Sequence, residues 1–450
     1  MAEKLKERIF EKTGISQIHI IPFDLGYLFY DILSVDNLKN LQFAQAFVDT
    51  LTDECKKDTG ILVRSNISVQ YSMKKVTKVG YLKTEIADEA ICIAKLTPNL
   101  FCYILTNGIG VFVLADLDAD AIAGIKDEVR PYSKAVTAYV QKRLSQTVIL
   151  NGLKDCDILS QEKALMLTFR LKCWETIAKA ASKYRIKPAR PFSGDGKYKM
   201  DGLSYVLTAY IIKKGEMSEE EVNYLMYAPL PKRCYSVEYC ELLQSGLDNR
   251  GSKLPETTVT TANSVIHFSW SAVAIITEND INSFDDIVSN PEVSALVRAE
   301  IYVQSKWFIA DNSIDNVKKS YNCSLEELQR AESLIEFYQA ELENEISANM
   351  NTLYKQVLEK VVQTSSVKSL YKSVIMQIRT QRKIKEAQAQ DVKKRNSLFL
   401  SMFMAVFTAS SLFKTINDII SNINSARNAA IFGAMLMLAI GTVLFDYYNK

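Results

Sequence analysis

The stretch KKRNSLFLSMFMAVFTASSLFKTIND, from Lys393 to Asp418, constrains the fold of this chain more than any other. Its residues from Leu398 to Phe413 are apolar except for recurring serine and threonine, and a second apolar run extends from Ala429 to Phe445. Each run is a little shorter than the roughly 20 residues of a membrane-spanning helix, and helical flanks can extend both. The sequence therefore predicts a transmembrane hairpin of two helices.

Basic residues predict the orientation of this hairpin. The connection between the two runs has only Lys414 and Arg427, whereas the segment before the first run contains Arg379, Arg382, Lys383, Lys385, Lys393, Lys394 and Arg395. The positive-inside rule then places the long N-terminal part in the cytoplasm. Lys450 returns to the same side, so we expect a multi-pass membrane protein with both termini in the cytoplasm.

Hydroxyl side chains recur on one face of the first predicted span. With Ser401 as position a of a heptad, the a and d positions are Ser401, Met404, Thr408, Ser411, Thr415, Asp418 and Asn422. The opposite f positions are Phe399, Val406, Phe413 and Ile420. Several copies with these polar stripes turned inward would line a wet axis, because a polar face is costly in lipid. We predict that the a and d residues line a pore, in which Met404 forms a hydrophobic ring.

A simpler alternative explains the same pattern. Serine and threonine hydroxyls can donate to the carbonyl four residues earlier and mark a close packing seam between helices. Asp418 and Asn422 continue the stripe, which favours the pore.

Two long helices are predicted before the apolar run. Ser324-Leu-Glu-Glu327 is a capping-box pattern, and apolar residues at helical spacing follow it as far as Val361. Thr364-Ser365-Ser366 predicts a break, after which Val367 to Phe413 contains neither glycine nor proline. At 1.5 Å per residue, this second helix would extend about 70 Å, from a cytoplasmic stalk into the bilayer.

The residues before the stalk predict an α/β or α+β domain. Strands are expected at Gln17–Ile21, Ile67–Met73, Ala90–Leu96, Phe101–Thr106, Val111–Leu117, Ser204–Ile212 and Ser264–Thr277, and helices near Asp118–Ile149 and Gln161–Tyr184. Asn107-Gly-Ile-Gly110 predicts a hairpin between two of these strands. The expected organisation is a cytoplasmic domain over 1–320, divided into two lobes near 150, a stalk over 321–396 and the hairpin over 397–450.

The best candidate ligand site is a loop rich in proline, glycine and basic residues, YRIKPARPFSGDGKYKMDG. Its basic side chains can bind phosphate and its aromatic rings can stack on a base: Tyr184, Arg185, Lys187, Arg190, Phe192, Lys197, Tyr198 and Lys199. A solvated surface loop is the alternative, since the loop has no phosphate-binding glycine motif.

Other function classes find little support in the sequence. The 54 basic and 52 acidic residues nearly cancel, so nothing draws the whole chain to nucleic acid. The eight cysteines form no metal-binding pattern, and no metal site is expected. Only two histidines occur, both in strand-like apolar runs, and no acid–base pair stands out, so we do not expect an enzyme.

The layout from Ser324 to Lys450, with a long helix, a span, a short loop, a second span and a short basic end, resembles the CorA family of divalent-cation channels. The resemblance is strongest in KKRNSLFLSMFMAVFTASSLF and AAIFGAMLMLAIGTVLFDYYNK. It implies a homo-oligomer, a tetramer or pentamer, with the first span around the axis. The family's Gly-Met-Asn signature after that span is replaced by Lys414–Asp418, so magnesium selectivity is not implied.

In size and layout the chain is similar to the CorA-like effectors of type III CRISPR systems, which act at the bacterial inner membrane. That similarity implies gating by a small nucleotide, a conjugate of S-adenosylmethionine and AMP. The leading hypothesis is an antiviral membrane effector opened by such a ligand. A divalent-cation channel with an altered filter and a non-conducting, membrane-anchored scaffold are the alternatives.

Overall fold

The computed structural model describes residues 15–29, 37–58, 61–65, 67, 90–116, 160–186, 207–227, 257–269, 272–319 and 324–419, with 430, 433, 434, 436–438, 440 and 441. The chain divides into two compact units. The first comprises Met1–Cys323 and Arg330–Gln377, and the second comprises Ser324–Gln329 and Ile378–Lys450.

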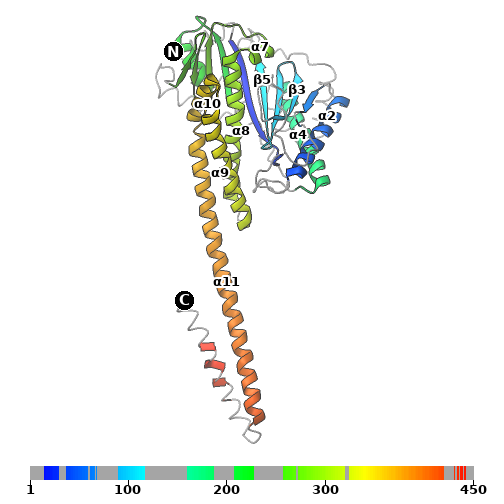
Figure 1. Cartoon of the computed structure of the whole chain (residues 1–450), viewed down its shortest axis with the longest axis vertical. Coiled ribbons are helices and arrows are strands. Elements are labelled where there is room, and N and C mark those ends of the chain that lie inside the picture. Colours follow the sequence, from blue (N-terminus) through cyan, green and yellow to red (C-terminus); the bar gives the residue numbers. More distant parts are fainter. Residues whose placement is uncertain are drawn as a thin grey trace. The chain divides into compact units, whose positions relative to one another are not determined.

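A mixed sheet of nine described strands organises the first unit (Figure 1). The spatial order is β2-β3-β4-β5-β1-β6-β9-β8-β7, and every neighbouring pair is antiparallel except β6 and β9. The strands are β1 Ile15–Asp24, β2 Leu62–Ser65, β3 Ala90–Thr97, β4 Leu100–Leu105, β5 Ile109–Asp116, β6 Leu207–Lys213, β7 Thr258–Thr260, β8 Ser264–Phe268 and β9 Ala272–Thr277. The order places β1 at the centre, where both of its edges are paired.

Most of the predicted strands are confirmed, because their β-branched and aromatic runs are buried. The five predicted strands that correspond to β1, β3, β4, β5 and β6 are present, with ends shifted by a few residues. The stretch Ser264–Thr277 is instead two antiparallel strands, β8 and β9. Ile67 is not in a strand, and the rest of the predicted strand Ile67–Met73 and the helix Asp118–Ile149 lie outside the described residues.

Helices cover both faces of this sheet. On one face, α2 (Asn37–Asp58) and α4 (Ser160–Tyr184) share an apolar core with Ile21 and Phe23 of β1. Ile18 and Ile20 point away from that core and are also fully buried, and α8 (Pro291–Lys319) contacts β1 and β5. Burial on both faces explains why β1 reads as a nearly continuous apolar run rather than an alternating one.

The other described helices are short or lie toward the C-terminal end. They are α5 Glu219–Tyr227, α7 Phe284–Ser289, α9 Leu325–Ala348, α10 Thr352–Ser365 and α11 Val367–Ile419. The helix expected from Ser324 to Val361 is split into α9 and α10, because Asn351 caps a new helix by accepting a hydrogen bond from the backbone nitrogen of Tyr354 at 3.0 Å. The capping box at Ser324 is present, with Glu327 N donating to Ser324 Oγ at 3.1 Å.

The predicted break after α10 is confirmed. Ser366 adopts a left-handed conformation with φ 53°, and α11 begins at the next residue. This helix contains 53 residues without interruption, as the absence of glycine and proline predicted. The chain is therefore a mixed α/β domain with a nine-stranded sheet followed by long C-terminal helices.

Candidate functional site

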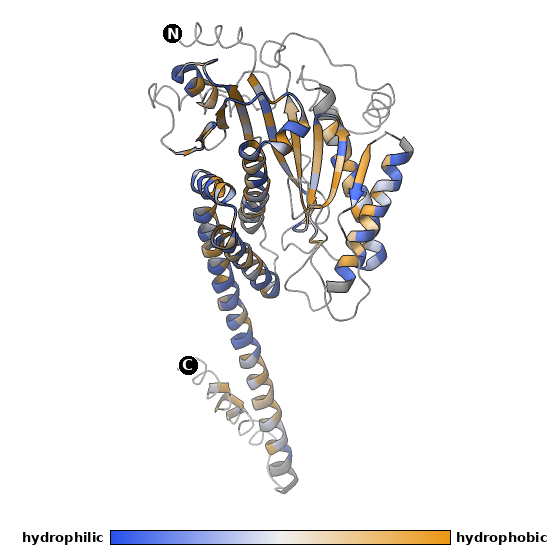
Figure 2. Ribbon diagram, turned by 45° about the horizontal axis from the view of Figure 1, so that its top comes forward, coloured by the Kyte–Doolittle hydropathy of each residue, from blue (hydrophilic) through white to orange (hydrophobic). Residues whose placement is uncertain are grey.

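One helix of the described part of the chain is long and apolar enough to cross a membrane, by its length and composition. It comprises 48 residues from Val367 to Lys414 within α11. Figure 2 shows α11 changing along its length from mostly hydrophilic to more hydrophobic residues. Large apolar side chains in the hydrophobic part are exposed, including Phe399 at 74%, Phe403 at 61% and Phe407 at 64%. A helix from the core of a soluble protein would bury such side chains.

The predicted pore-lining residues share this helix as far as Asp418. Ser401, Met404, Thr408 and Ser411 are exposed, and their heptad spacing on one continuous helix gives them a common face. Thr415 and Asp418 belong to the helix, whereas Asn422 lies outside the described residues. The residues at the f positions of the heptad, such as Phe399 and Val406, occupy the opposite face of the helix.

Two hydroxyls of this segment, those of Thr408 on the stripe and of Ser410 beside it, are bonded within the helix, as the packing-seam alternative also expects. Thr408 Oγ1 donates to the carbonyl of Met404 at 2.8 Å, and Ser410 Oγ donates to the carbonyl of Val406 at 2.8 Å. These bonds satisfy the hydroxyl donors, so the helix can enter an apolar phase without leaving them unpaired. Each hydroxyl oxygen keeps a lone pair for water, as a helix that lines a wet axis requires.

The start of the predicted ligand loop is described, and the rest is not. Tyr184 ends α4 and packs partly buried against the core beneath that helix. Arg185 is exposed with φ 52°, and Ile186 N donates to the carbonyl of Ala181 at 2.9 Å, which ends the helix. Lys187, Arg190, Phe192, Lys197, Tyr198 and Lys199 lie outside the described residues.

Four cysteines that appear scattered in the sequence gather in the core between α2, β3, β4 and α4. Cys55, Cys92, Cys102 and Cys173 are fully buried. Burial raises the pKa of the Cys102 and Cys173 thiols well above their ordinary value, and neighbouring thiols raise it further. Within the described residues no three cysteine, histidine or acidic side chains are placed to hold a metal ion. These thiols are therefore packing groups of the core.

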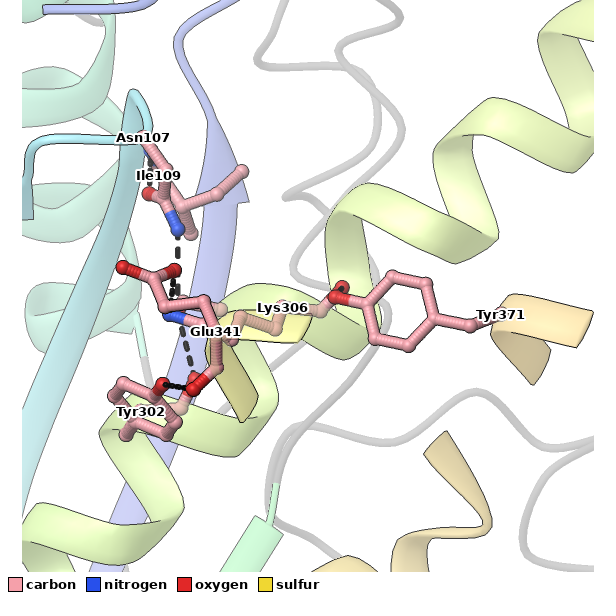
Figure 3. Close-up of polar contacts among 7 residues, drawn as sticks. Asn107, Ile109, Tyr302, Lys306, Glu341 and Tyr371 are labelled. Atoms are coloured by element: carbon pink, nitrogen blue, oxygen red, sulfur yellow. Dashed lines mark hydrogen bonds and ion pairs between the residues drawn. The ribbon is translucent and has the colours of Figure 1, made fainter. Parts of the chain in front are cut away.

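A buried lysine joins three helices of the first unit (Figure 3). Lys306 of α8 is fully buried, and its Nζ lies 3.2 Å from Glu341 Oε2 of α9. The same Nζ lies 3.7 Å from the ring centroid of Tyr302 and 5.8 Å from that of Tyr338. Tyr371 of α11 donates its hydroxyl to the backbone carbonyl of Lys306 at 3.1 Å. The ammonium is thus paired with one carboxylate and further stabilised by two aromatic rings.

Sequence reasoning missed this junction, although a signal for it exists. Lys306 interrupts the apolar run IYVQSKWFIA, and a lysine inside a buried helix needs a partner. Glu341 and Tyr371 lie 35 and 65 residues further along the chain, and nothing in their local sequence identifies them as that partner.

Glu300, also on α8, is a buried carboxyl, and no cation among the described residues contributes to its pKa shift. Its exposed fraction is 2%, and among the described residues its side chain has one hydrogen-bond partner, Gln304 Nε2 at 2.9 Å. Burial raises the pKa of the Glu300 carboxyl to about 7, and the bond from Gln304 opposes that rise only in part. Gln304 Oε1 is buried and has no hydrogen-bond partner within the described part of the chain.

Replacing Glu300 with glutamine is expected to change how stability depends on pH. The unfolded carboxyl titrates near 4.5 and the folded one near 7, so between these values only the folded protein keeps the proton, and the wild type loses stability as the pH rises. Relative to the wild type, E300Q should gain about 3 kcal/mol in free energy of unfolding across this range. Urea unfolding of both proteins at about pH 5 and about pH 8 measures this difference. An equal difference at both pH values would contradict it.

Comparison with family models, with curated proteins and with solved structures finds no match to this chain.

Proposed function

We propose that this chain is a homo-oligomeric membrane effector of CorA-like layout, in which α11 crosses the membrane and lines a pore. The observation that carries this proposal is the exposed apolar part of α11 with its hydroxyl stripe, Ser401, Thr408 and Ser411, opposite large apolar side chains. Hydroxyl oxygens keep acceptor capacity after they donate within the helix, and several copies that turn this stripe toward a shared axis would let water use it.

Basic residues support the orientation of the proposed span. Lys393, Lys394 and Arg395 are all exposed and directly precede the apolar residues of α11. Consecutive residues on a helix point in different directions, so these three charges surround the helix where it would leave the cytoplasm. The second span proposed over Ala429–Phe445, which would return the chain to the cytoplasm, is largely outside the described residues.

The soluble domain would control this pore by binding a nucleotide. The proposed ligand is the conjugate of S-adenosylmethionine and AMP that the resemblance to CRISPR-associated effectors implies, and the proposed contact is the basic loop that begins at Arg185. Among the described residues, the exposed Arg185 side chain directly after α4 supports this contact. The proposed setting is antiviral defence at the bacterial inner membrane.

Ion flux from liposomes tests the proposal. Full-length protein is reconstituted with an entrapped salt or dye, and efflux is measured with the conjugate, with AMP alone and without nucleotide. Efflux that requires the conjugate is the expected result. Flux of Mg²⁺ without nucleotide would replace the proposal with a cation channel of altered selectivity, and no flux in any condition would replace it with a non-conducting scaffold.

A further inference from the structure

We infer that a series of buried contacts, from Asn107 through Ser305 and the backbone carbonyl of Lys306 to Tyr371, transmits changes at the β4–β5 turn to α11. The inference rests on the proposed function, because it gives the soluble domain a physical route to the helix that would line the pore. It concerns the first unit alone, since α11 belongs to that unit as far as Gln377.

The route begins at the β4–β5 turn, which is tied to the core beneath α2 and α4. The carbonyl of Gly108 accepts a hydrogen bond from Leu25 N at 3.0 Å, and the carbonyl of Thr106 accepts one from Phe29 N at 3.0 Å. Phe29 in turn stacks on Phe43 of α2, with ring centroids 5.5 Å apart. A shift of α2 or of the core beneath it therefore acts on this turn.

Asn107 carries the route from the turn to α8. It is 3% exposed, and its Oδ1 accepts a hydrogen bond from Ile109 N at 3.0 Å, which fixes the side chain. Its Nδ2 then donates to Ser305 Oγ at 3.4 Å. Ser305 is fully buried, and its hydroxyl donates to the carbonyl of Tyr302 at 2.8 Å, so the contact is held within the helix.

The next residue of α8, Lys306, carries the route to α11. Its carbonyl is the acceptor for Tyr371 Oη, and Tyr371 is itself fully buried. Burial raises the pKa of the Tyr371 phenol well above its ordinary value, although Lys306 lowers it, so the hydroxyl stays protonated and remains a donor. A buried carbonyl that lost this donor would pay a desolvation cost, which makes the contact resistant to small displacements.

Glu341 determines how firmly α8 is held. Its side chain is 34% exposed, whereas that of Lys306 is fully buried, so the carboxylate of this ion pair contacts solvent and the ammonium does not. Tyr302 Oη also donates to the backbone carbonyl of Glu341 at 3.3 Å. Because leaving the ammonium buried without its carboxylate is costly, α8 and α9 move together, and Tyr371 moves with them. Tyr371 belongs to α11, which continues from there to Gln377 within the same unit.

Hydrogen exchange on the full-length protein tests this route without ligand or flux. The variants are Asn107→Ala, Tyr371→Phe and the double variant, and the readout is the exchange of amides 371–377. Each single variant should accelerate this exchange about fivefold, and the double variant should exceed Tyr371→Phe by little, because both changes interrupt one route. Ser305→Ala removes the other side of the Asn107 contact and should reproduce the effect of Asn107→Ala.

A core truncation in β8, Ile266→Val, is the matched control, because Ile266 is fully buried and takes part in none of the hydrogen bonds or ion pairs of the route. It should leave the exchange of amides 371–377 unchanged relative to other helices. Unchanged exchange in both Asn107→Ala and Ser305→Ala would overturn the inference, as would effects that simply multiply in the double variant. Since no flux is measured, these outcomes are independent of the liposome result.

Discussion

Replacing both Phe403 and Val406 with arginine is expected to prevent α11 from inserting into the membrane. Both residues are exposed on α11, at 61% and 39%, and both lie away from the hydroxyl stripe. An arginine near the centre of a span costs about 3 kcal/mol in insertion, so the two together oppose it by about 6 kcal/mol. The measurement is the fraction of protein that stays with the membrane after an alkaline carbonate wash, made on a chain that ends before Ala429 so that the second proposed span does not retain it.

The matched control replaces the same two residues with leucine, which keeps the segment apolar and should leave the membrane fraction unchanged. The comparison also separates a span from an exposed helix of a soluble protein. On such a helix the two arginines would change stability by only about 0.5 kcal/mol each, and the protein would behave as the wild type does. Equal partitioning of the arginine and leucine variants would therefore contradict a membrane-crossing α11.

Replacing Gly110 with alanine is expected to lower the free energy of unfolding by about 3 kcal/mol. Gly110 of β5 pairs with Phe23 of β1, and a Cβ at Gly110 would overlap the Phe23 ring. That ring is 1% exposed and stacks on Phe112 with centroids 4.8 Å apart, so it has no free space to enter. Urea unfolding followed by circular dichroism measures the loss.

A second change at Phe23 distinguishes overlap from other effects of alanine. Combining Gly110→Ala with Phe23→Leu removes the atoms that the new Cβ would meet, so the double variant should lose less stability than the sum of the two single variants. The same alanine substitution at Gly215 is a poor comparison, because that residue has φ 89° and would be strained for a different reason. Strictly additive losses would show that the Phe23 ring is not the cause.

The sequence was informative where one physical requirement determines local structure. The predicted runs form β4 as far as Leu105 and β5 as far as Asp116 because both faces of the sheet are covered, and Asn107-Gly108 turns between them with φ 77° at Gly108. The uninterrupted helix from Val367 was predictable for a similar reason, since it contains no residue that breaks a helix.

Prediction was weaker where the structure depends on contacts between distant residues. The apolar spacing continues across Asn349-Met350-Asn351, yet the helix ends there, because Asn351 caps α10. The whole of α8 was missed, since its apolar and polar residues face the sheet and the other helices in turn. The Lys306 junction requires α8, α9 and α11 to be placed in space, which no local pattern gives.

The same contrast, between what local spacing predicts and what depends on distant contacts, applies to the candidate site. Residues of the hydroxyl stripe could be assigned to one helix face from their spacing, and α11 provides that helix as far as Asp418. The stripe's orientation toward an axis depends on contacts between copies of the chain, and it stays a prediction. The ligand loop also stays a prediction, because most of its residues lie outside the described part.

Cysteine accessibility along α11 tests the proposed pore most directly. First, serine replaces the four native cysteines outside the described residues, which are Cys156, Cys234, Cys240 and Cys323. Single cysteines are then introduced one at a time from Phe399 to Phe413, and each full-length protein is reconstituted in liposomes. A membrane-impermeant thiol reagent is then applied with the nucleotide conjugate present. A pore predicts modification at Ser401, Thr408 and Ser411, and protection at Phe399, Val406 and Phe413. Modification of the second set with protection of the first, or equal reactivity throughout, would contradict it.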